Sequence, residues 1–264
     1  MEPKSFLYQE KDGIGIITLN RPDTFNSLTF EVYAELRDIF PELAKRDAVK
    51  VVVITGQGKG FCSGGDVNAI IGELMKMDTK GLLDFTRMTG QVIKNMRALP
   101  KPVIASVNGI AAGAGAVIAL ASDLRIASER AKFAFLFVRV GLAGADMGAA
   151  FLLPRLVGLG KATELLYTGD VVTAEEALRI GLVNKLVKED ALMSETISLA
   201  SKLSKGPGFA LGLTKEALNK ELSLDLDSAI DKEAEIQALC MVTKDFNEGY
   251  RAFVEKRETR FQGK

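Results

Sequence analysis

The chain has 264 residues, 34 basic and 34 acidic side chains, 47% hydrophobic residues and no histidine. A formal net charge of zero gives no electrostatic reason to expect nucleic acid or an anionic membrane as a partner. The lack of histidine excludes Ser-His-Asp and Cys-His nucleophilic chemistry and removes the commonest transition-metal ligand, so we expect no metal site. Proton transfer must use a carboxylate, a lysine, a tyrosine, a cysteine or water.

Cysteine usage and the two chain ends favour a cytoplasmic location. Cys62 and Cys240 lie far apart without a C-x-x-C spacing, which argues against a disulfide framework and a zinc site. Residues 1–5 have no charged-then-apolar leader, and the longest apolar stretch, 109–121, is too short to span a bilayer. The last three residues carry no peroxisomal signal. We therefore expect a cytoplasmic protein with no membrane-spanning segment.

Hydrophobic patterns in the first half alternate between strands and helices. The expected strands cover residues 13–20, 51–55, 103–107, 124–127 and 133–135, and the expected helices cover residues 30–45 and 115–122. The β-branched run 51–55 is typical of a strand buried on both faces. Pro41 should kink or divide the first helix. Such alternation predicts an α/β core with parallel strand pairing.

The second half is almost entirely helical beyond Gly148. Residues 173–176 form a capping box at the start of one helix, and a last short strand is expected to begin at Gly181. From about Gly206 the pattern is helical only, and it ends in a charged segment. The sequence thus predicts a core over residues 1–205 and an all-helical region over residues 206–264.

Two glycine-rich loops, 56–66 and 108–116, each follow a predicted strand and precede a helix. Glycines there suit tight turns and close packing, but they also let backbone N–H groups approach a ligand. No phosphate-binding G-x-x-x-x-G-K-[ST] motif occurs, and Ile118 stands where a dinucleotide fingerprint needs its third glycine. Two such loops on successive strands can aim two N–H groups at one oxygen, which is the arrangement of an oxyanion hole.

Five segments in the same order make the chain resemble the enoyl-CoA hydratase/isomerase (crotonase) family. The segments are 20–22 with 26–28, 61–66 (FCSGGD), 102–105 through 108–109, 174–177 with 181–183, and 248–249 with 252–257. They extend across nearly the whole chain. The resemblance implies a crotonase-like spiral of ββα turns followed by a helical C-terminal trimerisation region. It also implies an acyl-CoA thioester substrate, no cofactor beyond the coenzyme A that the substrate carries, and a homotrimer or dimer of trimers.

The resemblance also implies which residues form the site. The backbone N–H groups of Gly65 and Ala114 would form the oxyanion hole. The remaining candidates belong to the substrate and CoA groove, and they are Ser27, Lys59, Ser63, Asp66, Val67, Asn68, Phe253 and Lys256. Phe253 and Lys256 would reach the adenine and phosphate end from a neighbouring subunit. For Lys59 an ordinary solvated lysine is an equal alternative, and we expect Asp66 to stabilise the first turn of its helix.

The sequence departs from the family at the two glutamates of typical hydratases, whose positions hold Val117 and Phe137. One acid remains nearby, Asp146, between Ala145 and Met147. A desolvated carboxylate there would have a raised pKa and would suit a general acid/base. The alternative is that Asp146 caps the helix that begins near Gly148. Pairing of Asp146 with Arg139 is also open.

Phe133, Phe135 and Phe137 alternate along the expected strand, so that one face would carry three aromatic rings. A core stripe is one interpretation, and the other places Phe137 against a bulky or aromatic acyl group.

Three functions remain open at this point. Asp146 as the single carboxylate suits double-bond isomerisation, and atypical hydration is close behind. The alternative is a non-catalytic acyl-CoA-binding or scaffold subunit that has lost both glutamates. A leucine-rich stripe beyond Gly206 indicates self-association in each case.

Overall fold

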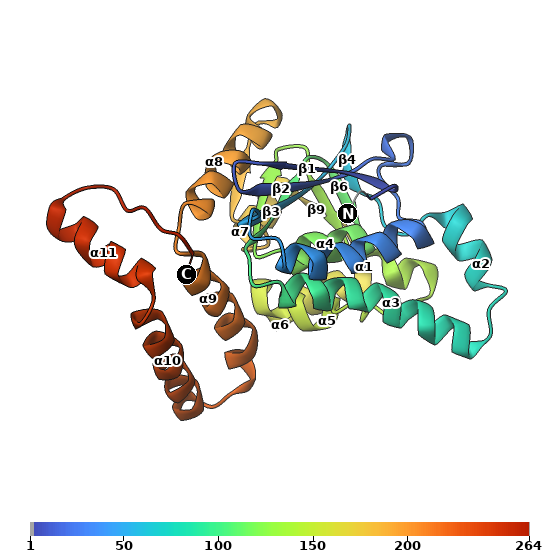
Figure 1. Ribbon diagram of the computed structural model, residues 1–264. Coiled ribbons are helices and arrows are strands. Elements are labelled where there is room, and N and C mark those ends of the chain that lie inside the picture. Colours follow the sequence, from blue (N-terminus) through green and yellow to red (C-terminus); the bar gives the residue numbers. More distant parts are fainter. Residues whose placement is uncertain (1–2, 264) are drawn as a thin grey trace.

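The computed structural model describes residues 3–263 and contains two mixed β-sheets covered by helices (Figure 1). The larger sheet has the order β1-β2-β3-β5-β7-β10. Its strands are β1 (Phe6–Lys11), β2 (Ile14–Leu19), β3 (Val51–Gly56), β5 (Val103–Val107), β7 (Leu124–Ser128) and β10 (Lys185–Val187). All neighbours pair in parallel except β1 and β2, which form an antiparallel hairpin. The strand β1 was not predicted.

The smaller sheet has the order β4-β6-β8-β9. Its strands are β4 (Gly60–Cys62), β6 (Ile110–Ala112), β8 (Lys132–Ala134) and β9 (Val172–Thr173). The pairs β3–β4, β5–β6 and β7–β8 each place one strand in the larger sheet and the next in the smaller sheet. Because this step repeats along the chain, the core is the expected spiral of ββα turns.

The strand β3 is buried on both faces, as its β-branched sequence predicts. Val52 and Ile54 belong to the main hydrophobic core. Val51 and Val53 point to the opposite face, where a second apolar cluster packs against α8. This burial fixes the strands from whose ends the glycine-rich loops depart.

Helices cover the two faces of the larger sheet unequally. The helices of the core are α1 (Phe30–Ala44), α2 (Gly72–Leu74), α3 (Thr79–Ala98), α4 (Ala114–Ala121), α5 (Ala149–Val157), α6 (Leu159–Thr168), α7 (Ala174–Arg179) and α8 (Leu192–Ser204). Figure 1 shows α1, α3, α4, α5 and α6 on one side of the strands and α8 on the other. At α7 the predicted cap is confirmed, since the Thr173 side chain accepts the N–H of Glu176 at 3.3 Å.

Pro41 lies inside α1 without dividing it, so the expected division of this helix is wrong. A proline in a helix leaves the carbonyl four residues earlier without its donor. That carbonyl belongs to Arg37, and the side-chain amide of Asn95 on α3 donates to it at 2.7 Å. A neighbouring helix therefore replaces the hydrogen bond that the proline removes.

Two expected strands differ from the structure. The strand expected over residues 133–135 is β8, which ends at Ala134, because β6 and β9 extend no further alongside it. Residues 136–140 form a short 3-10 helix instead. The last strand begins at Lys185 rather than at Gly181, because residues 181–184 turn out of α7 before they can pair with β7.

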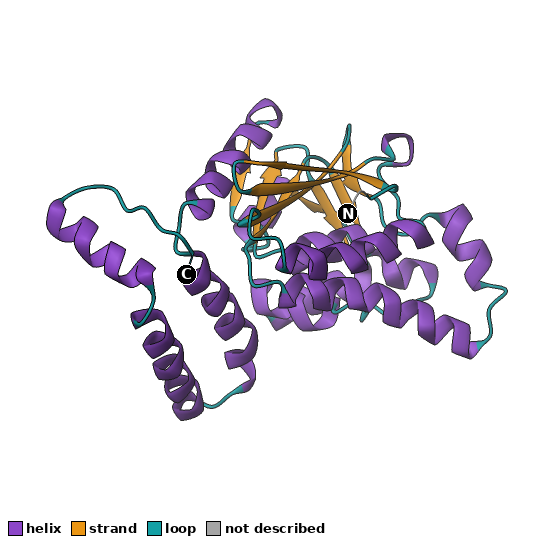
Figure 2. Ribbon diagram, in the orientation of Figure 1, coloured by secondary structure: helices purple, strands orange, loops and turns teal. Residues whose placement is uncertain are grey.

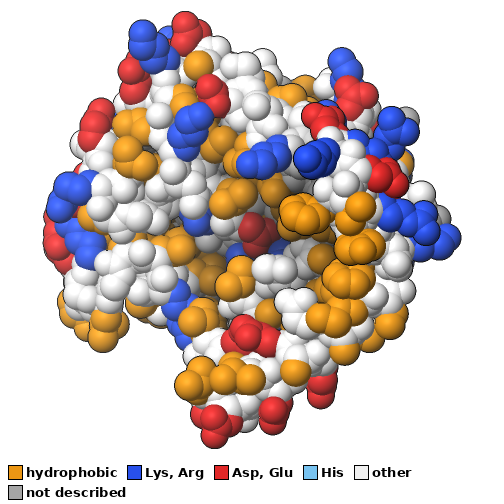
Figure 3. All heavy atoms as spheres, turned by 90° about the vertical axis from the view of Figure 1, so that its left-hand side faces the viewer, with side chains coloured by type: hydrophobic (Ala, Val, Ile, Leu, Met, Phe, Trp, Pro, Cys, Tyr) orange, Lys and Arg blue, Asp and Glu red, His pale blue; other side chains and the backbone are white. Residues whose placement is uncertain are grey.

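Beyond β10, the described chain contains only helices and loops (Figure 2). The helices after α8 are α9 (Gly208–Lys220), α10 (Leu226–Met241) and α11 (Lys244–Glu255). In Figure 1 the helices α10 and α11 extend away from the core, and Figure 3 shows many hydrophobic side chains on that face of the molecule. None of the sixteen residues of α10, all of which the structure describes, is buried. Among residues 3–263, no helix combines the length and apolar character needed to cross a membrane.

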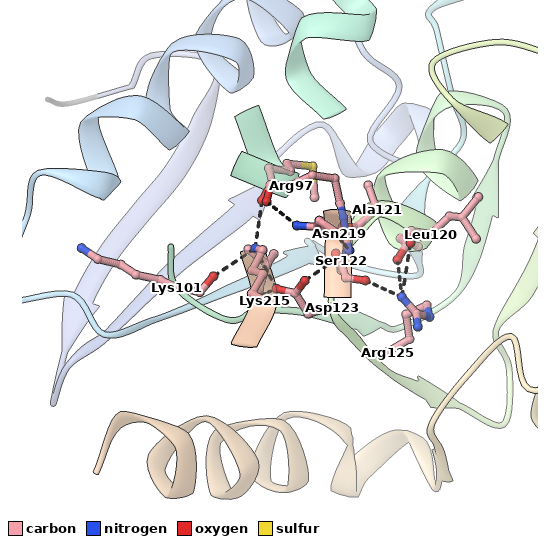
Figure 4. A network of polar contacts seen from close by, with 12 residues as sticks. Arg97, Lys101, Leu120, Ala121, Ser122, Asp123, Arg125, Lys215 and Asn219 are labelled. Carbon is pink, nitrogen blue, oxygen red and sulfur yellow. Dashed lines mark hydrogen bonds and ion pairs between the residues drawn. The ribbon is translucent and has the colours of Figure 1, made fainter. Parts of the chain in front are cut away.

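A buried polar network joins α9 to the core (Figure 4). The ammonium of Lys215 donates to Met96 O at 3.0 Å and to Lys101 O at 3.1 Å, and it pairs with Asp123 at 2.8 Å. The other carboxylate oxygen of Asp123 pairs with Arg97 at 3.0 Å. These contacts fix the first C-terminal helix to the core, in contrast with α10.

Candidate active site

The two glycine-rich loops lie against each other at the ends of β4 and β6. Gly64 has φ +99°, and a Cβ built on it would lie 3.0 Å from Ala112 O and 3.6 Å from Ala114 N. A Cβ on Gly115 would lie 2.1 Å from Cys62 O, so that no other residue fits there. Glycine in both loops is therefore required by the close approach of two backbones. The expected meeting of the two loops is confirmed.

The N–H of Gly65 faces away from its nearest backbone neighbour. Leu28 N–H donates to Gly64 O at 2.8 Å, and Asp66 N–H donates to Leu28 O at 2.9 Å. In a parallel bridge of this kind, the residue between the two bonded groups directs its own N–H to the opposite side. The N–H of Gly65 is therefore available to another acceptor.

The N–H of Ala114 is available for a different reason. Ala114 is the first residue of α4, and the first four N–H groups of a helix have no acceptor within the preceding turn of the helix. The preceding residue, Gly113, has φ +50° and provides no side-chain cap. All eight residues of α4 are buried, so that this helix end is held rigidly beside the first loop.

Asp66 stabilises the local structure, as expected. One of its carboxylate oxygens accepts the N–H groups of Asn68 and Ala69 at 3.0 Å each, which caps the helical turn over Val67–Ile71. The other oxygen accepts the Ser27 hydroxyl at 3.0 Å and pairs with Arg21 at 2.8 Å. The hydrogen bond from Ala69 and the contacts with Arg21 and Ser27 lower the pKa of Asp66 to about 2. Asp66 and Ser27 are thus both engaged with protein groups.

The other loop candidates divide into engaged and exposed residues. The Ser63 hydroxyl donates to Thr24 O at 2.8 Å, which ties the first glycine-rich loop to the segment that precedes α1. The side chains of Val67 and Asn68 are exposed directly after Asp66, and Val67 is 71% exposed. Lys59 is also exposed, and its backbone lies against Gly109 of the second glycine-rich loop.

Asp146 lies in the loop before α5 and makes no ion pair within residues 3–263. Burial raises its carboxyl pKa from the ordinary value, and the N–H of Met147 offsets this only in part. Arg139 pairs instead with Asp170 at 2.6 Å, so that the suggested pairing of Arg139 with Asp146 is wrong. Asp146 also does not cap α5 through its side chain, since the cap residue is Gly148 and only the backbone oxygen of Asp146 is used.

Phe137 is not on a strand face with Phe133 and Phe135, so the expected alternation of three rings is wrong. Phe137 belongs to the 3-10 helix Leu136–Val140 and is 8% exposed, within the main core cluster. Its backbone oxygen accepts the N–H of Leu142, in the loop that leads to Asp146. Val117, at the other glutamate position, is fully buried in α4.

Phe253 and Lys256 lie at the far end of α11, away from the glycine-rich loops of the same chain (Figure 1). Phe253 is 84% exposed, and Lys256 ends the helix with φ +54°. Within one chain the structure therefore does not bring these two residues to the other candidates.

A cavity of about 970 Å³ lies between the core and α9, separate from the glycine-rich loops. Its lining includes Arg97, Asp123, Lys215 and Phe151, and it extends to Met147 beside Asp146. Polar groups of the buried network therefore form part of its wall.

One polar side chain next to Gly65 was not predicted from the sequence. The hydroxyl oxygen of Tyr33, on α1, would lie 3.7 Å from a Cβ on Gly65. Tyr33 sits within the apolar stripe of α1, next to Val32 and three residues before Leu36. A tyrosine in such a stripe is the only sequence signal that could have indicated it.

Comparison with known proteins identifies the family. Residues 9–264 match the family model described as enoyl-CoA hydratase/isomerase. The crotonyl-CoA hydratase of Syntrophomonas wolfei is 38% identical over the full length of both chains. The 1,2-epoxyphenylacetyl-CoA isomerase of Escherichia coli K12 is 36% identical, with 96% of each chain covered. A solved structure from Streptomyces coelicolor A3(2) is 52% identical, covers 100% of this chain and 96% of its own, and has a TM-score of 0.97. The chain therefore belongs to the enoyl-CoA hydratase/isomerase family and has the crotonase fold.

Proposed function

We propose that the protein isomerises a double bond in an unsaturated acyl-CoA thioester, with Asp146 as the single acid/base and the N–H groups of Gly65 and Ala114 as the oxyanion hole. The observation that carries this proposal is the desolvated carboxylate of Asp146, which has no cationic partner within residues 3–263. The N–H groups of Gly65 and Ala114, which bond no protein acceptor in the described chain, belong to the two loops that lie against each other. A carboxylate with a raised pKa is suited to accept and return a proton near neutral pH.

The proposed reaction conserves all atoms. The Asp146 carboxylate removes a proton from one carbon of the acyl chain, and the electron pair of that C–H bond moves toward the thioester carbonyl. The carbonyl oxygen then carries negative charge, which the N–H groups of Gly65 and Ala114 stabilise. The protonated Asp146 returns its proton to a different carbon, so that the double bond has moved.

Hydration with Asp146 as the only base is the second candidate. It is supported by the 38% identical crotonyl-CoA hydratase. The apolar residues Val117 and Phe137 oppose it, because a water needs polar partners and these positions provide none. A non-catalytic acyl-CoA-binding subunit is the remaining alternative.

We extend the proposal to bulky or aromatic acyl groups and to an oligomeric enzyme. The backbone of Phe137 is bonded to the loop that leads to Asp146, and an apolar ring at this position favours apolar contact. A 36% identical relative acts by its name on an epoxyphenylacetyl-CoA. The exposed apolar surface of residues 206–264, with no buried residue in α10, favours a homotrimer or dimer of trimers. Phe253 and Lys256 would then bind the CoA of a neighbouring subunit.

A panel of unsaturated acyl-CoAs, analysed by mass spectrometry and ultraviolet absorbance, tests the chemistry. Isomerisation shifts the double bond without a change of mass, whereas hydration adds the mass of one water. We expect isomerisation, and we expect Asp146→Asn to lower kcat by about 10²–10⁴ because general acid–base catalysis contributes that much.

The matched control is Asp170→Asn, which removes an exposed carboxylate paired with Arg139. It should leave kcat unchanged. Binding of acyl-CoA without turnover of any panel member would favour the non-catalytic subunit instead.

A further inference from the structure

Tyr33 is held in place by apolar packing rather than by its hydroxyl group. The residue is 3% exposed and belongs to the main hydrophobic core. Its ring meets the ring of Phe85 on α3 edge to face, with centroids 5.9 Å apart and planes at 89°. The ring of Phe85 in turn packs edge to face against the ring of Phe30, with the two centroids 5.3 Å apart. The position of the ring on α1 is therefore fixed without any polar contact.

The Tyr33 residue is 3% exposed, but its hydroxyl forms no hydrogen bond with residues 3–263 and is not one of the fully buried polar atoms that lack a partner, so the oxygen itself reaches solvent. Buried hydroxyls elsewhere donate to protein oxygens: Thr55 to Ser106 O at 2.9 Å, Ser122 to Ile118 O at 3.1 Å, and Thr196 to Leu192 O at 2.8 Å. Buried polar groups in proteins are nearly always paired. The Tyr33 hydroxyl differs from these groups, because its hydrogen bond is left for water or for a ligand that displaces water.

The hydroxyl faces the proposed reaction centre. Its oxygen would lie 3.7 Å from a Cβ on Gly65, and the side chain of Ile70 would lie 3.9 Å from it, so the hydroxyl is in van der Waals range of this position. Burial, followed by the nearby Cys62 and Asp146, raises the pKa of the Tyr33 phenol above its ordinary value. The group is therefore a neutral O–H at physiological pH and acts as a donor.

An O–H group that faces a substrate site discriminates between acyl groups. A pure hydrocarbon placed against it leaves the donor unpaired after water has been displaced, which is unfavourable. An oxygen atom on the acyl chain accepts the hydrogen bond instead. Sites that contain an unpaired polar group reject analogues that lack the matching group far more strongly than apolar pockets reject an extra methylene.

We propose that Tyr33 is a specificity-determining residue, which donates a hydrogen bond to an oxygen atom near the β-carbon of the acyl chain and so selects oxygen-bearing acyl-CoAs over hydrocarbon acyl-CoAs of equal length. The proposal rests on the function proposed above, since it places the thioester beside Gly65. The distance of the hydroxyl from Gly65 puts the recognised oxygen close to the thioester rather than at the far end of the acyl group.

Binding measurements with two matched probes test this proposal. Dissociation constants are measured by calorimetry for 3-oxobutyryl-CoA and for butyryl-CoA, which differ by one acceptor oxygen and do not lose water. We expect the parent protein to bind the oxygen-bearing probe about 10- to 100-fold more tightly, and Tyr33→Phe to bring that ratio close to one. The variant keeps the ring and its contact with Phe85, and its melting temperature should equal or exceed that of the parent, because the hydroxyl that is removed bonds no protein group among residues 3–263.

The matched control is Tyr8→Phe, which removes a hydroxyl that donates to Glu10 at 2.7 Å on β1. It should leave the ratio of the two dissociation constants at its parental value. An unchanged ratio in Tyr33→Phe, or a lowered melting temperature that reveals a structural partner, would overturn the proposal. Failure of the parent to bind either probe would instead overturn the proposed function, and the proposal about Tyr33 with it.

Discussion

The buried network at α9 and the proposed active site both contain polar groups that are at least half-buried, but they differ in how those groups are paired. In the network, Asp123 accepts from Arg97, Lys215 and the backbone N–H of Val103 at 2.8–3.0 Å. At the site, Tyr33 has no hydrogen-bond partner among residues 3–263 and Asp146 has no cation. The chemical groups are similar, and only their partners differ.

Under the proposed function, this difference separates a cluster that stabilises the fold from one that binds a ligand. A fully paired network contributes to the packing of α9 on the core, and burial lowers the pKa of Lys215 while Asp123 opposes that shift. Unpaired groups with perturbed pKa values concentrate at functional sites. A substitution in the first cluster should therefore change stability, and a substitution in the second should change activity.

The largest effect should come from Lys215→Met. The change leaves Asp123 with only part of its compensation in a site where Lys215 is 7% exposed. Breaking a buried pair in this way typically lowers the free energy of unfolding by about 3–5 kcal/mol. Urea denaturation followed by circular dichroism measures the loss, and kcat of the folded fraction should not change.

Lys220→Met on the same helix provides the control for that comparison. Lys220 pairs with Glu216 on the surface, with the two side chains 63% and 47% exposed. An exposed pair of this kind contributes about 0.3–0.5 kcal/mol. Equal destabilisation by the two variants would show that the buried network has no special weight.

Ala114→Pro should show the opposite behaviour, with lost activity and a retained fold. Proline is tolerated at the first position of a helix, which Ala114 occupies in α4, and it removes only the N–H. Loss of one oxyanion donor lowers kcat by about 10²–10³. Steady-state kinetics measure the loss, while Ala114→Gly keeps the N–H and should retain most of the activity. Unaltered turnover in a folded proline variant would remove Ala114 from the oxyanion hole.

The smallest effect concerns pH and Asp146. Its folded pKa is raised above the ordinary 3.8, so kcat should fall as the pH drops through that raised value, at a higher pH than for an ordinary aspartate. The folded protein binds this proton more tightly than the unfolded chain does, so the associated stability is present below the unfolded pKa and is lost as pH rises through the folded pKa. Asp146→Asn should therefore be at least as stable as the parent at pH 7, and the difference should vanish in acid. Melting temperatures measured across pH check this, and a variant less stable at pH 7 would contradict it.

The sequence predicted the elements that depend on local patterns. The run Val51–Gly56 shows its burial in its β-branched residues, and the small residues before and within α4 show the helix that follows the second loop. The capping role of Asp66 could also be predicted, because an acidic residue directly before a helical turn is a local signal.

Features that depend on residues distant in the sequence could not be predicted from local patterns. At Pro41 within α1, the donor that the proline lacks is replaced by Asn95 from another helix. The strand predicted to include Phe135 ends one residue earlier because its neighbouring strands are short. The length of those strands depends on other segments of the chain. Tyr33 belongs to an ordinary apolar stripe, and the lack of a partner for its hydroxyl is visible only once the fold has placed every nearby oxygen.

The contact between Gly115 and Cys62 has a consequence for how this protein can diverge. A Cβ on Gly115 would meet a main-chain oxygen at 2.1 Å rather than the end of a flexible side chain. A clash with a side chain can be relieved when that side chain is replaced, whereas every amino acid at position 62 brings the same carbonyl oxygen. No second-site substitution at residue 62 can therefore accommodate a larger residue at 115. The junction of the two loops therefore tolerates less change than positions whose neighbours are side chains.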